Sequence, residues 1–242
     1  MRTDPITTSP LALETDSAHS GLGRWRLWQL IDSAFPTGGF AHSNGLESAW
    51  QHGAIRNITQ LSAWILASLE QSARSALPFV LAVHREPAKY AQWDEDCHCL
   101  LASNPVASEA SRKQGLALMR GGQHIFPNHV AKCNDWLAAA NRPHTHLAPS
   151  FGLMAAALDI DAETLAESWL FLQLRAVISS AIRLGVVGPM EGQLLQQRLG
   201  EDALRLLRLF AGLTPESAAQ PAPLLDLWQA AHNRLYSRLF QS

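Results

Sequence analysis

The chain has 242 residues, of which 47% are hydrophobic, so it can form one large domain or two small ones around a substantial core. A formal net charge of −2 gives no electrostatic reason to expect nucleic acid as a partner. Three cysteines are an odd number and too few for a disulfide framework, which favours a reducing, cytoplasmic compartment. The sequence has no uninterrupted apolar run of about 18 residues and no apolar signal segment at its start, so we expect neither a membrane span nor secretion.

Residues 1–23 are rich in Ser, Thr and Pro, and we expect them to form a flexible N-terminal arm. From residue 24 onward, apolar residues recur at helical spacing between glycines and prolines, without a convincing strand alternation. This pattern predicts an all-α, single-domain helical bundle of about ten helices, with its main body over residues 24–223. Residues 224–242 are expected to form a C-terminal helix and a docking tail.

Helix boundaries are predicted from capping residues and from glycine or proline breaks. The longest predicted helix, 162–184, is apolar nearly all round and should lie in the middle of the bundle. Residues 88–104 look less regular than the rest of the chain. The other helices are expected near 24–35, 44–53, 57–69, 78–87, 105–121, 127–141, 149–158, 189–199, 202–210 and from 224 onward.

The stretch from Trp28 to Gly53 is typical of a helix, a sharp glycine turn and a second helix. Pro36 should end the first helix, because the residue before a proline is pushed out of the α region. Gly38 and Gly39 permit backbone angles that a side chain disfavours. This glycine pair is not followed by the lysine of a phosphate loop, so we expect no nucleotide hydrolysis by this motif.

Polar residues flank the turn on both sides. Asn44 and Glu47 have the spacing of a helix N-cap and its reciprocal partner. The remaining polar side chains are of the types that can form a catalytic nucleophile, a base and an orienting group. The sequence contains no nucleophile elbow, so we expect these residues to be helix caps and contact residues instead. This polar cluster consists of Asp32, Ser33, His42 and Ser43. The turn residues expected to shape this region are Asp32, Pro36, Gly38, Gly39, Phe40, His42, Gly45 and Glu47.

Cys97, His98 and Cys99 are the best candidates for metal ligands, because thiolates and imidazole suit Zn, Ni or Cu. The motif has no partner pair at zinc-site spacing, and a free cysteine is commonly a small buried hydrophobe. We therefore expect no metal site, with these three residues as the alternative. Other side chains that the fold could add to such a site are His124, His129, Cys133, His144 and His146.

Two arginines, Arg175 and Arg183, lie in the longest predicted helix. Such arginines are either paired internally or reach a surface, where they can complete the nucleotide site of a partner protein. The internal role is favoured here.

The C-terminal run combines Arg, Tyr and Phe, which are enriched at interface hot spots. Its apolar groups must either fold back or dock on another chain, and we expect docking. The predicted partner-binding residues are Arg234, Leu235, Tyr236, Arg238, Leu239 and Phe240.

Five segments of the chain, in the correct order, resemble the signature segments of the urease accessory protein F (UreF) family. Residues 1–23 and 85–104 match no signature, and Ala41, Pro189 and Asn233 depart from the usual pattern. The matching segments are LWQLIDSAFPTGGFAHSNGLES (27–48), SRKQGLALMR (111–120), HLAPSFGLMAAAL (146–158), SSAIRLG (179–185) and LYSRLFQS (235–242).

This resemblance implies a non-enzymatic maturation factor that is all-α, tends to form homodimers and binds no cofactor directly. Members of the family act with UreD (also called UreH) and the GTPase UreG on the urease apoprotein, so that nickel is inserted in a GTP-dependent way. The family's UreD-binding tail falls on residues 234–240 of this chain. A direct nickel carrier using Cys97, His98 and Cys99 is the alternative, and regulation of the GTPase through Arg183 or Arg175 is a third hypothesis.

Overall fold

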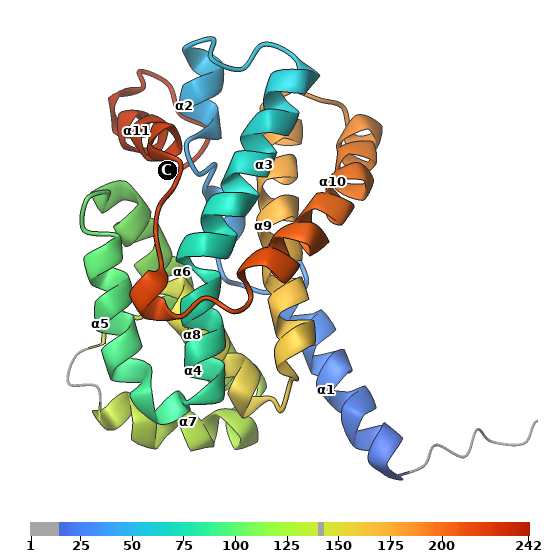
Figure 1. The fold of residues 1–242 in the computed structure, drawn as a ribbon, viewed down its shortest axis with the longest axis vertical. Coiled ribbons are helices and arrows are strands. Elements are labelled where there is room, and N and C mark those ends of the chain that lie inside the picture. Colours follow the sequence, from blue (N-terminus) through green and yellow to red (C-terminus); the bar gives the residue numbers. More distant parts are fainter. Residues whose placement is uncertain (1–14, 140–142) are drawn as a thin grey trace, which may run out of the picture.

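The structure is a computed structural model that describes residues 15–139 and 143–242. These residues form eleven α-helices and four short 3-10 helices, without a strand, and the prediction of an all-α bundle is confirmed (Figure 1). The α-helices are α1 (Thr15–Ile31), α2 (Leu46–Gln51), α3 (Ile58–Ser75), α4 (Leu77–Arg85), α5 (Tyr90–Leu100), α6 (Pro105–Ile125), α7 (Pro127–Ala139), α8 (Leu147–Ala157), α9 (Ala162–Arg183), α10 (Pro189–Phe210) and α11 (Pro223–Ala231).

Helix α9 runs through the middle of the bundle, where it packs against α3, α4 and α10 (Figure 1). Its length and composition alone would let it cross a membrane, but 56% of its apolar window is buried against the rest of the protein, as in the core helix of a globular fold. Helices α4 and α8 also pack closely against each other. Their backbones meet at Gly152, where an added Cβ would lie 2.2 Å from the carbonyl oxygen of Val80.

Three helices begin at side-chain caps. The side chain of Asn57 accepts a hydrogen bond from the main-chain N–H of Gln60 at the start of α3. Asn104 does the same at the start of α6, and Asp161 at the start of α9. Each cap satisfies a main-chain donor that has no partner inside the helix.

The structure differs from the helix prediction at four places. Helix α1 begins at Thr15, so only residues 1–14 of the expected arm lie outside the described residues. It ends at Ile31, five residues before Pro36, and the carboxylate of Asp32 then accepts the N–H of Ala34 in the following turn. The stretch expected to be irregular contains α5. Helix α10 runs unbroken past Gly200, because one glycine costs a helix only about 1 kcal/mol.

Candidate partner-binding site

The C-terminal tail, residues 235–242, folds back over the glycine turn of its own chain (Figure 1). The main-chain N–H of Gln241 donates to the carbonyl oxygen of Ala41 at 2.7 Å, and the N–H of Ser43 donates to that of Ser242 at 2.5 Å. The Oγ of Ser242 lies 2.6 Å from Nδ1 of His42. In the single chain the tail therefore folds back, and its docking on another chain stays a prediction.

The buried carboxylate of Glu47 binds the main chain of the tail. The residue is 1% exposed, and it accepts the main-chain N–H groups of Leu239 at 2.6 Å and of Phe240 at 3.1 Å. Its Oε2 also lies 2.9 Å from Nε2 of His232, which is fully buried. The expected capping pair with Asn44 is wrong, since Glu47 instead binds main chain about 190 residues later in the sequence.

Gly45, which lacks a capping side chain, stands at the N-cap of α2. Its φ is +86°, and an added Cβ would lie 2.8 Å from the main-chain nitrogen of Gln229. Gly45 therefore serves two purposes: it makes the left-handed turn, and it lets α11 approach α2 closely. Gly38 has a φ of +73° and precedes the short 3-10 helix Gly39–Ala41, on which Phe40 is carried.

Arg183 joins the turn to the tail. Its guanidinium lies 4.3 Å from the centre of the Phe240 ring, and its Nη1 donates to the carbonyl oxygen of Phe40. A cation held over an aromatic ring by such a contact stabilises both partners. Arg175 lies over the ring of Phe171 instead and lines a partly open pocket of about 360 Å³ beside the turn. Burial lowers the pKa of Arg175, and the charge of Asp32 partly offsets this effect.

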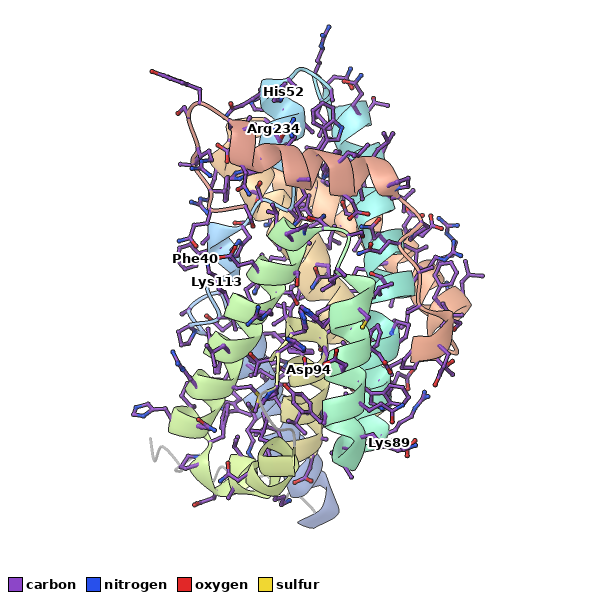
Figure 2. The ribbon with its side chains drawn as sticks, turned by 90° about the vertical axis from the view of Figure 1, so that its left-hand side faces the viewer. Phe40, His52, Lys89, Asp94, Lys113 and Arg234 are labelled. Carbon is purple, nitrogen blue, oxygen red and sulfur yellow. The ribbon has the colours of Figure 1, made fainter. Side chains whose placement is uncertain are left out.

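Anchoring leaves one face of the tail uncovered. Phe240 is only 4% exposed, whereas Tyr236 is fully exposed and Leu239 is 53% exposed. Arg234 and Arg238 are also exposed, and Leu235 is partly so. Phe40 is 72% exposed. In Figure 2 it lies at the left edge of the bundle, below the end that is formed by α2 and α11 and that carries Arg234.

The polar residues of the turn do not form a nucleophile–base set. His42 and Ser43 use their hydrogen bonds on Ser242 and on the N–H of Glu47, and Asp32 uses its own within the turn. Burial lowers the pKa of His42, and the charge of Lys113 adds to this effect. A neutral His42 therefore belongs to the tail contact.

The cysteines of α5 lie in different surroundings. Cys97 is buried and lines the same pocket, whereas Cys99 is exposed. Burial raises the pKa of the Cys97 thiol well above its usual range, so it stays protonated. Two thiols on different sides of one helix cannot share an ion, and the alternative metal site of Cys97, His98 and Cys99 is wrong as stated.

Sequence comparison identifies the family. A model of the UreF family matches residues 55–200, which is more than half of the chain. The chain belongs to the UreF family. The UreF-like chain is 38% identical to urease accessory protein F of Arabidopsis thaliana over 231 residues, which is 93% of this chain and 95% of the relative.

Two further relatives of this UreF family member extend the comparison. Urease accessory protein F of Oryza sativa subsp. indica is 36% identical over 220 residues, or 89% of this chain and 84% of the relative. UreF of Arthrobacter sp. strain FB24 is 27% identical over 225 residues, or 93% of this chain and all of the relative. These proteins are named as accessory proteins. The family model covers neither the glycine turn before residue 55 nor the tail after residue 200.

Proposed function

We propose that this UreF family member is a non-catalytic subunit of a GTP-dependent, cytoplasmic assembly that inserts nickel into apo-urease. It would bridge a UreD/UreH-type protein and a UreG-type GTPase and regulate the latter. The observation that carries this proposal is the anchored tail. Its inner residues are fixed by Glu47, while Tyr236 and Leu239 face outward with Phe40 nearby. A rigid apolar surface of this kind binds with little loss of conformational freedom.

The proposal is tested by pull-down of a purified UreD-type partner. Deleting residues 234–242 should abolish binding, but that deletion also removes the two main-chain partners of Glu47. Tyr236→Ala and Leu239→Ala remove outward side chains only, and each should weaken binding about tenfold while the thermal midpoint stays unchanged. Leu209→Ala, at a 61% exposed site on α10, is the matched control and should bind normally. Wild-type binding by the Tyr236→Ala, Leu239→Ala double variant would contradict the assignment.

Regulation of the GTPase is part of the same proposal, through Arg175 or Arg183. Arg183 already holds Phe240 and Phe40, so its replacement changes the tail as well. Arg175→Lys is the cleaner variant, because lysine keeps the charge but cannot form the planar guanidinium contact. A lower rate of GTP turnover in the assembled complex, with assembly unchanged, would support a direct contribution. An unchanged rate would contradict it for Arg175.

Homodimer formation is the last part of the proposal, and the surface that supports it is on α1. This helix projects from the lower end of the bundle (Figure 1), and it carries Leu22, Trp25 and Trp28 at 56%, 66% and 58% exposure. Large aromatic residues on an unpartnered helix face are typical of interfaces between subunits. Replacement of both tryptophans by serine should convert the dimer to a monomer in multi-angle light scattering. Leu224→Ser, 67% exposed on α11, is the control and should remain dimeric.

A further inference from the structure

Three imidazole rings gather between α5 and the segment that leads into α8. The rings of His98 and His144 are stacked with their centres 3.8 Å apart. The ring of His146 lies 5.4 Å from that of His98 and 5.9 Å from that of His144. Glu95, one helical turn before His98, places Oε2 3.0 Å from Nε2 of His144. The sequence alone separates these groups by almost 50 residues, and the fold brings them together.

His146 is fixed in place by its surroundings. The residue is fully buried, and its main-chain N–H donates to the carboxylate of Asp94 at 2.8 Å. Its segment can approach α6 because Gly115 has no side chain; an added Cβ would lie 1.9 Å from the carbonyl oxygen of Thr145. Nδ1 of His146 lies 3.1 Å from Oγ of Ser111. A hydrogen bond at one nitrogen of an imidazole orients the ring, and the other nitrogen can then coordinate a metal ion.

The other ring nitrogen of His146 is hydrogen-bonded to a second imidazole, and an ion bound by both rings would replace this bond. Nε2 of His146 lies 3.1 Å from Nδ1 of His98. Two ring nitrogens that bind one first-row ion at about 2.0–2.1 Å are themselves about 3 Å apart, so this spacing fits two neighbouring ligands. The positive charge of Arg112 disfavours a cation at this place, whereas the negative charge of the Glu95 carboxylate favours one.

The described residues contain no group of three or more His, Cys, Asp or Glu side chains that is already arranged for a metal ion. A third ligand must therefore turn inward when the ion binds. His144 and Glu95 can do so, since their side chains are 26% and 62% exposed. Their present contact with each other is a hydrogen bond at the surface, which costs little to exchange.

We propose that His98 and His146 form the fixed half of a site for a first-row divalent metal ion such as Ni²⁺ or Zn²⁺, and that His144 and Glu95 complete it on binding. Imidazole nitrogen is the ligand that these ions share, and a carboxylate is compatible with both. This site uses His98 without the two cysteines beside it in the sequence. It does not depend on the proposed function, because metal binding is a property of the isolated chain.

The experiment is isothermal titration of the full chain with NiSO₄ and, separately, with ZnSO₄. We expect one site per chain, weakened tenfold or more by His98→Ala and by His144→Ala. Ser111→Ala should weaken it about tenfold, because the ring of His146 loses its orienting partner. His124→Ala and Cys99→Ser, both at exposed positions, are the controls and should bind as the wild type does. His146 itself is left intact, since its burial makes a folding defect the expected result of replacing it.

X-ray absorption of the nickel-loaded chain provides a second readout. We expect imidazole scattering with nitrogen and oxygen ligands and no sulfur. Absence of one-site binding in the wild type, unchanged affinity in both His98→Ala and His144→Ala, or a sulfur ligand would each overturn the proposal. Circular dichroism of every variant separates lost ligands from lost structure. Because the UreD-type pull-down uses a different surface, failure of this proposal and failure of the proposed function can be told apart.

Discussion

At the scale of single residues, Glu47 carries the largest energetic consequence. Its buried carboxylate is shared by two main-chain N–H groups and by His232. Replacing it by alanine removes the partner of all three groups, of which His232 and the N–H of Phe240 are buried and the N–H of Leu239 is partly buried. Breaking a buried, hydrogen-bonded charge network by removing one partner costs about 3–5 kcal/mol.

Chemical denaturation should therefore show that Glu47→Ala lowers the free energy of unfolding by about 3–5 kcal/mol. Glu201→Ala, on the exposed face of α10, is the matched control, and its change should stay within about 0.5 kcal/mol. Limited proteolysis should cleave the tail of the Glu47→Ala protein faster than that of the control. Equal stability of the two variants would show that the tail contact contributes nothing.

His42 makes the same contact sensitive to pH. Burial lowers its pKa, so the folded state binds this proton more weakly than the unfolded state, whose pKa is about 6.5. The contribution of a neutral His42 is complete above that value. It is lost as the pH falls below about 6.5, at up to about 1.4 kcal/mol for each pH unit until the folded pKa is reached.

We expect amide hydrogen exchange in residues 239–242 to accelerate between pH 7.5 and 5.5 relative to the intrinsic rate. His42→Gln should remove this pH dependence. The charged groups that face His42 are Lys113 and Glu109 on α6 and His232 beside α11. A pH profile that is the same in His42→Gln would assign the effect to one of these groups instead.

At the scale of elements, two mid-helix glycines should respond in opposite directions. An added Cβ at Gly115 in α6 meets main-chain atoms of the segment before α8, whereas at Gly200 in α10 it meets nothing within 4 Å. Gly115→Ala should destabilise the protein by about 1–3 kcal/mol through overpacking. Gly200→Ala should stabilise it by up to about 1 kcal/mol, because alanine is the better helix former. Thermal denaturation of the two variants checks both signs, and a shift in the same direction would contradict the packing.

The elements also show what a sequence can predict. The caps Asn57, Asn104 and Asp161 leave a local pattern in the sequence, because a cap contacts main chain only three residues away. Helix α5 was missed because its acidic residues look solvent-exposed. One of them, Asp94, is in fact buried against main-chain N–H groups about 50 residues later. Long-range partners of this kind leave no local pattern.

At the scale of the whole molecule, the arrangement of the bundle was predictable and the arrangement of the candidate site was not. The apolar character of α9 on all sides indicated its central place, which the structure confirms. The residues of the turn and the tail were identified as two separate regions. Their union depends on Glu47 and Arg183, which looked like a cap partner and an arginine of a core helix. The histidine cluster was predictable only as a set of residue types.

The contact between Glu47 and the tail joins a segment made early during translation to one made about 190 residues later. Until the later segment leaves the ribosome, the carboxylate has neither of these main-chain partners. A chain that premature termination or a carboxypeptidase shortens before Leu239 therefore lacks both main-chain donors to Glu47.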